Sequence, residues 1–222
     1  MECSGYLDLE ERPETDGGER TISLVGTEFG RILELVQARD ILDVGSAEGP
    51  GKVDLEPSSH TRLAEATRSP LGIDTAASEI ERRQVQGYDV AVPDAQSFEL
   101  GRKFAVIVTA DFIEHLGNSG VFPERGGEHL QPGGLRCFVT PNALSLNNDL
   151  KSLARLRVGV NAEHICWYDW KALRKLLAHG FQPVDEYWQD DQTHPLAFAL
   201  RLRRSLAAHL IMIAGRSKTG AV

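Results

Sequence analysis

The stretch Ile41-Leu42-Asp43-Val44-Gly45-Ser46-Ala47-Glu48-Gly49 is the starting point for predicting the fold of this sequence. Its first four residues are apolar apart from Asp43, which is typical of a short strand buried on both faces. Gly45 and Gly49 then allow a sharp turn and let a ligand approach the backbone closely. Strands that end this way at the edge of a parallel sheet hold nucleotide-like cofactors in α/β proteins. The spacing Gly-x-x-x-Gly is not the dinucleotide fingerprint Gly-x-Gly-x-x-Gly, so a plain strand-to-helix turn stays open as an alternative.

Six later segments also have the composition of strands, and helical segments separate most of them. The predicted strands after the first are 71–74, 88–92, 104–108, 135–140, 181–188 and 209–214. The predicted helices are 21–38, 61–67, 76–87, a helix around 150–156, 170–178 and 196–208. Alternation of this kind predicts an α/β fold with a doubly wound, mostly parallel, seven-stranded Rossmann-like sheet. The last two strands follow one another without the earlier crossover pattern, so we expect an antiparallel C-terminal strand at the sheet edge.

Composition and charge narrow the class of protein. The chain has 222 residues and a formal net charge of -8, which argues against a general nucleic-acid binder. Its polar, acidic residues 1–20 predict a flexible tail, and residues 21–222 suffice for a single domain. Three scattered cysteines, Cys3, Cys137 and Cys166, fit free thiols in a reducing cytoplasm. No apolar run approaches the length that spans a bilayer.

Asp74 ends the second predicted strand, Leu71-Gly72-Ile73-Asp74. At this place in nucleotide-binding α/β domains an acidic side chain accepts hydrogen bonds from the two ribose hydroxyls. An N-cap of the following helix is an equally good interpretation of Asp74 taken alone.

Taken in order, these segments resemble a class I S-adenosylmethionine-dependent methyltransferase over roughly residues 25–216. The resemblance rests on Asp43-x-Gly45-x-x-x-Gly49, Asp74, the pair Asp94-Ala95, Phe104 to His115, Pro132-Gly133-Gly134, Thr140-Pro141-Asn142, and His164 to Phe181. It implies an S-adenosyl-L-methionine cofactor, with Asp43 near its ammonium group, Asp74 on its ribose and Asp94 on its adenine. The full set of implied cofactor-binding residues is Asp43, Gly45, Ser46, Gly49, Asp74, Thr75, Asp94, Ala95 and Ala110.

A metal site is a further expectation. Asp111, Glu114 and His115 fall at i, i+3 and i+4, so they share one face if a helix begins at Asp111. With His164 they offer two carboxylates and two imidazoles, which suit Mg²⁺ or Mn²⁺. The pattern resembles the Glu-x-x-Glu-His plus distal His of small-RNA 2′-O-methyltransferases, and a shorter form occurs in O-methyltransferases of ubiquinone biosynthesis. Glu114, His115 and His164 are the expected catalytic residues with or without a metal. In many family members, however, a Glu-His pair here is structural.

The function that the resemblance implies is methyl transfer, with O-methylation of a small-molecule or glycan-like acceptor as the main hypothesis. A metal-assisted RNA 2′-O-methyltransferase and a catalytically inactive cofactor-binding module are the alternatives. The missing Gly-x-Gly-x-x-Gly disfavours a nicotinamide-dependent oxidoreductase.

Several other residues have a structural and a functional interpretation. His60 follows the irregular stretch after Gly49, and we expect it to be a solvated loop residue. Trp167, Tyr168 and Trp170 are expected to pack in the core rather than line a substrate pocket. The sequence also has two basic clusters, which are expected to be solvated helix faces. The alternative is that they bind an anionic substrate. The clusters are Lys151, Arg155 and Arg157, and Arg201, Arg203 and Arg204.

Overall fold

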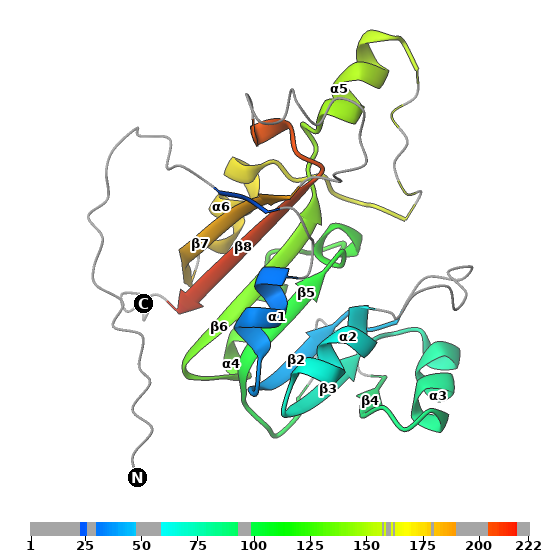
Figure 1. Ribbon diagram of the computed structural model, residues 1–222, viewed down its shortest axis with the longest axis vertical. Coiled ribbons are helices and arrows are strands. Elements are labelled where there is room, and N and C mark those ends of the chain that lie inside the picture. The colour runs from blue at the N-terminus through cyan, green and yellow to red at the C-terminus, as the bar shows by residue number, and fades with distance from the viewer. Residues whose placement is uncertain are drawn as a thin grey trace.

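The computed structural model describes residues 23–25, 30–47, 59–92, 99–156, 158, 161, 163–178, 180–189 and 204–216. They form an eight-stranded sheet in the order β1-β7-β8-β6-β5-β2-β3-β4 (Figure 1). Its strands are β1 Ser23–Val25, β2 Asp40–Val44, β3 Ser69–Ile73, β4 Val90–Ala91, β5 Phe104–Ala110, β6 Leu130–Pro141, β7 Phe181–Gln189 and β8 His209–Arg216. Its helices are α1 Gly30–Val36, α2 Ser59–Ala66, α3 Ala77–Val85, α4 Val121–Glu128, α5 Leu146–Leu153 and α6 Trp170–Leu177, with short 3₁₀ turns η1 Ile113–His115 and η2 Arg204–Leu206.

All seven predicted strands are present, and the doubly wound, mostly parallel arrangement is confirmed. Strand β8 is antiparallel to both of its neighbours, as expected of the C-terminal strand. Its predicted place at the sheet edge is wrong, because β8 lies between β6 and β7. The physical reason is pairing between segments far apart in sequence: β8 forms ladders with β6 on one side and β7 on the other, and its residues Leu210 to Ala214 are buried.

The predicted helix over 21–38 is wrong in its first part. Ser23–Val25 forms β1, which pairs in parallel with β7 from Ser23↔Tyr187 onward. The helix α1 begins only at Gly30. Strand β1 supplies partners for the backbone groups at the edge of β7, which a helix in its place could not do.

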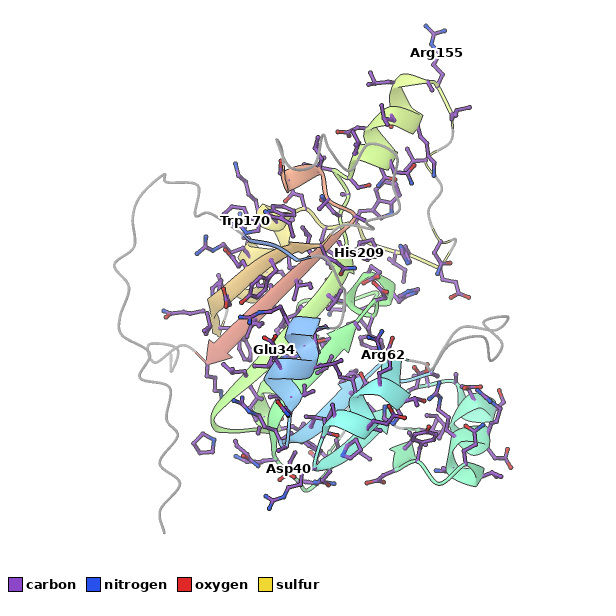
Figure 2. All side chains as sticks on the ribbon, in the orientation of Figure 1. Glu34, Asp40, Arg62, Arg155, Trp170 and His209 are labelled. Atoms are coloured by element: carbon purple, nitrogen blue, oxygen red, sulfur yellow. The ribbon has the colours of Figure 1, made fainter. Side chains whose placement is uncertain are left out.

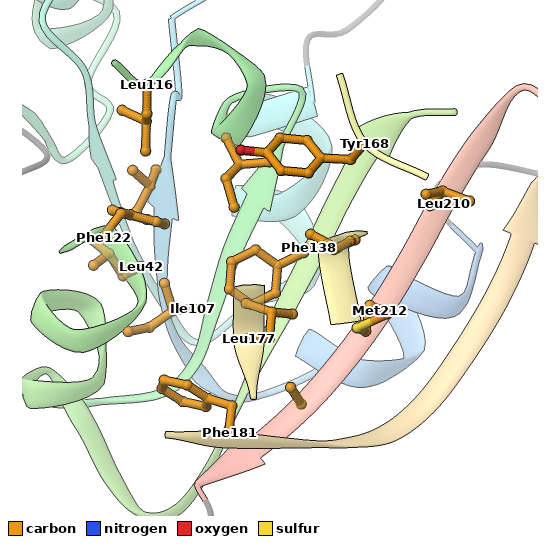
Figure 3. Packing of buried hydrophobic residues seen from close by; sticks show 14 of the residues in the cluster. Leu42, Ile107, Leu116, Phe122, Phe138, Tyr168, Leu177, Phe181, Leu210 and Met212 are labelled. Atoms are coloured by element: carbon orange, nitrogen blue, oxygen red, sulfur yellow. The ribbon is translucent and has the colours of Figure 1, made fainter. Parts of the chain in front are cut away.

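The core has two layers, one on each face of the sheet. On one face α1 and α2 contribute Ile32, Val36 and Leu63, which pack with alternate residues of β5 such as Val106. On the other face α6 contributes Leu177, which packs with side chains including Phe138 and Met212 (Figure 3). Helices on both faces are the arrangement expected of a parallel sheet.

The region around α5 differs from an ordinary surface helix. Ser145 caps α5 by accepting a hydrogen bond from the backbone N–H of Asn148. Two leucines of this region are exposed, Leu153 by 80% and Leu156 by 62%. Arg155 lies at the far end of this region, away from the sheet (Figure 2).

The other expectations have mixed outcomes. Tyr168 is buried in the core and Trp170 packs against it, as predicted, but Trp167 is exposed by 45%. Cys137 and Cys166 are free thiols. Residues 1–20, Cys3, Arg157 and most of the predicted helix 196–208 lie outside the described residues. No described helix is both long enough and apolar enough to cross a membrane.

Candidate cofactor and catalytic site

The turn after β2 depends on a glycine at position 45. Gly45 has a φ of 82°, a left-handed conformation that L side chains rarely adopt. A Cβ there would lie 2.7 Å from Cδ2 of Phe112, the residue that precedes η1. The N–H groups of Gly45 and Ser46 both donate to the carbonyl oxygen of Ile73, at 2.9 and 3.2 Å. The turn is thus fixed against the ends of both β3 and β5.

Asp74 joins the ends of β2 and β3. Its Oδ2 accepts a hydrogen bond from the N–H of Ala47 at 3.0 Å, and its Oδ1 accepts one from the N–H of Ala76 at 2.9 Å. Helix α3 has Ala76 as its N-cap, without a side-chain cap. The N-cap interpretation of Asp74 is therefore wrong. The carboxylate lies instead against the turn after β2, and Thr75 is exposed beside it.

Asp43 is buried behind that turn, with its carboxylate directed at a histidine. Oδ2 of Asp43 lies 2.9 Å from Nδ1 of His60, and both side chains are almost fully buried. The expectation that His60 is a solvated loop residue is therefore wrong. His60 belongs to α2 and contacts Asp43, which lies 17 residues earlier in the sequence. No sequence signal distinguished it, because one histidine beside two serines is common in loops.

The remaining predicted cofactor residues are only partly placed. Ser46 is buried beside Asp43, and Ala110 ends β5 at the same edge of the sheet. Gly49, Asp94 and Ala95 lie outside the described residues. The described carboxyl ends of β2, β3 and β5 thus bring together Asp43, Gly45, Ser46, Asp74, Thr75 and Ala110.

A second cluster contains the three predicted catalytic residues, two from the turn after β5 and one from the segment before α6. Glu114, His115 and His164 each offer a ligand atom, and these atoms lie within 4.8 Å of one another. The rings of His115 and His164 meet edge to face, with their centroids 4.7 Å apart. Nε2 of His164 lies 3.9 Å from Oε1 of Glu114, too far for a direct hydrogen bond.

Glu114 is the most perturbed acid in this cluster. Burial raises the pKa of its carboxyl group from 4.5 to about 7, with a smaller contribution from the negative charge of Asp111. The hydroxyl of Thr140 donates to Oε2 at 3.0 Å, whereas Oε1 is buried with no hydrogen-bond partner among the described residues. Burial and the neighbouring His115 lower the pKa of His164. Glu114 is therefore placed to exchange a proton near neutral pH, and the neutral form of the His164 imidazole is favoured.

Asp111 does not lie with the other three predicted metal ligands. Its φ is 47°, so the chain turns sharply there, and the 3₁₀ turn begins only at Ile113. The expected helix from Asp111, with a shared face for Asp111, Glu114 and His115, is wrong. Asp111 is exposed and stays outside the group of three ligand atoms found among the described residues.

Backbone hydrogen bonds hold the segment of His164 against η1. The carbonyl oxygen of Glu114 accepts from the N–H groups of Ile165 at 2.9 Å and Cys166 at 3.1 Å. Asn142, just after β6, pairs with Tyr168 and donates its side-chain amide to the carbonyl oxygens of Ser205 and Ala207. Thr140 and Asn142 were noted only as the end of a strand, and their hydrogen bonds could not be inferred from spacing.

The residues present suit the groups that the family resemblance implies. The glycine turn is flanked by the hydroxyl of Ser46 and the carboxylate of Asp74. The Ser46 hydroxyl is buried with no hydrogen-bond partner among the described residues. These polar groups suit a ligand with a ribose and an amino-acid end. The buried, unpartnered Oε1 of Glu114 beside two imidazoles suits a divalent cation.

Known proteins share sequence similarity with most of this chain. The sequence model of the family described as "Methyltransferase domain" matches residues 19–186. A "Ubiquinone biosynthesis O-methyltransferase" from Caulobacter sp. (strain K31) is 30% identical over 158 residues, 65% of this chain and 59% of that protein. The protein of the same name from Chelativorans sp. (strain BNC1) is 30% identical over 132 residues, 56% of this chain and 46% of that protein. The chain thus spans about half the length of the curated relatives it matches.

Solved structures share the fold at low sequence identity. A SAM-dependent methyltransferase from Archaeoglobus fulgidus is 14% identical, with a TM-score of 0.63 over 85% of this chain and 91% of that chain. Magnesium protoporphyrin IX methyltransferase from Synechocystis PCC 6803, solved with bound SAH, is 14% identical, with a TM-score of 0.57 over 82% of this chain and 75% of that chain.

Proposed function

The chain belongs to the methyltransferase-domain family of class I S-adenosylmethionine-dependent enzymes, and on that premise we propose that it methylates an oxygen of a small-molecule or glycan-like acceptor. The observation that carries the proposal is the cluster of Glu114, His115 and His164 at the carboxyl end of β5, beside the cofactor residues. An acceptor hydroxyl must lose a proton as it is methylated, and this cluster supplies groups that take protons. The names of the relatives support the choice of oxygen and of a small acceptor.

The cofactor residues have separate tasks in this proposal. Asp74 holds the ribose hydroxyls, and the backbone from Gly45 to Ala47 packs against the amino-acid end. The cofactor supplies an electrophilic methyl group on a sulfonium ion. Methyl transfer needs an aligned acceptor in a site from which water is excluded, so positioning supplies much of the rate.

His164 is the proposed base for the acceptor hydroxyl. Its lowered pKa keeps the imidazole neutral at pH 7, so Nε2 can accept a proton. The carboxyl group of Glu114, 3.9 Å away, stabilises the imidazolium that forms. Substituting Glu114 therefore lowers the rate even if the acceptor never touches it.

A bound Mg²⁺ or Mn²⁺ is the second form of the proposal, with Glu114, His115 and His164 as ligands. Three ligand atoms within 4.8 Å of one another favour it, because ligands of one cation lie at such separations. A cation held there by Glu114, His115 and His164 would supply Lewis acidity to the acceptor oxygen. The same cluster would serve the RNA 2′-O-methyltransferase alternative, against which the net charge of -8 argues.

A turnover assay tests the proposal and separates its two forms. Formation of S-adenosylhomocysteine is followed with a panel of phenols, catechols and sugars, in EDTA and again with added Mn²⁺ or Mg²⁺. Turnover that is lost in EDTA and restored by the cation supports the metal site, and full turnover in EDTA supports His164 as base. His164→Ala is expected to lose at least a hundredfold in kcat, while the exposed Lys171→Ala serves as control. Binding of S-adenosylhomocysteine without turnover of any acceptor, RNA oligonucleotides included, would contradict the proposal and favour the inactive-module alternative.

A further inference from the structure

We propose that His60 is a positioning residue for the cofactor, which acts by fixing the carboxylate of Asp43 through its Nδ1–H group. Nδ1 of His60 lies 2.9 Å from Oδ2 of Asp43. An ionised carboxylate can only accept hydrogen bonds, so the ring nitrogen is the donor. The inference rests on the proposed cofactor site, because Asp43 lies in the strand that leads into the glycine turn.

The surroundings of His60 hold its ring in one place. The ring lies over Gly72 of β3, where a Cβ would be 2.7 Å from Cε1 of His60 and 2.8 Å from Oγ of Ser46. Tyr88 packs edge to face on the ring, with the centroids 5.6 Å apart. Gly72 is the β-sheet partner of Asp43. Because Gly72 has no side chain, the ring of His60 has room to contact the Asp43 carboxylate.

The burial of the pair points to a role beyond packing. Nε2 of His60 and Oγ of Ser46 are both buried without a hydrogen-bond partner among the described residues. Leaving buried polar atoms unpaired destabilises the folded protein, and an apolar residue of similar shape at position 60 would avoid that cost. What the imidazole provides that an apolar side chain cannot is the donor to Asp43.

The pair also links two segments that flank the cofactor turn. Asp43 lies two residues before Gly45, where the turn begins. His60 lies in the first turn of α2, after residues 48–58, which lie outside the described part. The hydrogen bond therefore fixes the start of α2 relative to the turn that would hold the amino-acid end of the cofactor. Loss of the donor removes the hydrogen bond that fixes Oδ2 of Asp43, so the carboxylate can change its orientation beside that turn.

Asparagine and leucine at position 60 make a matched pair of variants. They have nearly the same shape, but the side-chain amide of asparagine can donate from the place of the ring Nδ1, whereas leucine cannot. Both remove Nε2 and both leave the same space unfilled. A difference between the two variants therefore reports on the hydrogen bond to Asp43 rather than on packing.

The test is calorimetric titration of S-adenosylhomocysteine into the full-length wild type, His60→Asn and His60→Leu. We expect His60→Asn to bind within about threefold of wild type, and His60→Leu to bind at least about tenfold more weakly than His60→Asn. In turnover, His60→Leu raises KM for S-adenosylmethionine and leaves kcat at saturating cofactor nearly unchanged. Equal affinities of the two folded variants would overturn the inference, even if both melt at lower temperature than wild type.

A measurement on the wild type covers the case in which a variant does not fold. Nitrogen-15 NMR of histidine-labelled protein reports which ring nitrogen carries the proton. A proton on Nδ1 of His60 supports the inference, and a proton on Nε2 with a bare Nδ1 overturns it. If the wild type does not bind S-adenosylhomocysteine at all, the proposed cofactor site fails, whereas the NMR result still decides whether His60 donates to Asp43.

Discussion

The carboxylate of Asp74 accepts a hydrogen bond from the backbone N–H of Ala47 at 3.0 Å, which ties the end of β3 to the turn after β2. The two residues are 27 positions apart in sequence and meet because their parallel strands end at the same edge of the sheet. The acid expected to bind ribose thus lies directly beside the glycine turn expected to bind the amino-acid end of the same cofactor.

Asp74→Asn is expected to weaken S-adenosylhomocysteine binding by at least about tenfold, because hydrogen bonds to a charged acceptor are stronger than those to a neutral one. The amide oxygen can still accept from one backbone N–H, so the free energy of unfolding should fall by only about 1 kcal/mol. Titration calorimetry and urea denaturation measure the two effects. Glu81→Gln, an exposed acid in α3, is the matched control. Unchanged affinity in Asp74→Asn would remove this residue from the cofactor site.

Gly45→Ala and Gly87→Ala separate backbone strain from steric clash. Both glycines have positive φ, 82° and 90°, but a Cβ at Gly87 meets nothing within 4 Å, whereas one at Gly45 lies 2.7 Å from Phe112. We expect Gly87→Ala to lower the free energy of unfolding by about 1 kcal/mol and Gly45→Ala by about 2–4 kcal/mol, measured by urea denaturation. Adding Phe112→Ala should recover part of the loss in Gly45→Ala only. Equal losses in the two single variants would show that Phe112 does not pack closely against this turn.

Glu114→Gln is expected to flatten the pH dependence of stability in metal-free protein. The pKa of Glu114 is raised from 4.5 to about 7, so the folded state favours the protonated acid. Its contribution to stability is fully present below pH 4.5 and is lost as the pH rises through 7. Each pH unit in that window contributes about 1.4 kcal/mol, which gives up to about 3 kcal/mol in total. Urea denaturation in EDTA at pH 5 and pH 8 should show the loss in wild type and not in Glu114→Gln. Parallel losses in the two proteins would mean that Glu114 titrates normally.

Thr140→Val is expected to raise the pKa of Glu114 further. The hydroxyl of Thr140 donates to Oε2 of Glu114 at 3.0 Å and so favours the ionised form. Valine keeps the shape but removes the donor, whereas Thr140→Ser keeps it. The pH–rate profile of methyl transfer should move to higher pH in Thr140→Val and stay in place in Thr140→Ser. Coinciding profiles in all three proteins would show that the state of Glu114 does not limit the rate.

Much of the fold could be predicted because it depends on local patterns. The apolar run 104–108 is a central strand of the sheet, and the glycine turn and Asp74 do end neighbouring strands. Local composition could not place β8 inside the sheet, since strand order is set by packing between segments far apart in sequence. Nor could it show β1, a strand of three residues that exists through its pairing with β7.

The site was predicted less completely, for physical reasons that particular residues show. The resemblance grouped Glu114 and His115 with the distal His164, and the three do meet, because the end of β5 and the segment after β6 lie at one edge of the sheet. Spacing alone was a weaker guide. It failed for Asp111, whose left-handed backbone turns it away from a helix that does not begin there. It failed for His60, since its partner Asp43 becomes its neighbour only once β2 and α2 have packed.

Titration of the full-length protein with S-adenosylhomocysteine and with NAD tests most directly whether the ends of β2 and β3 form one adenosyl-cofactor site. The account predicts that S-adenosylhomocysteine binds with one site per chain and micromolar or tighter affinity, and that NAD gives no measurable heat of binding. Saturable binding of NAD together with no binding of S-adenosylhomocysteine would contradict it.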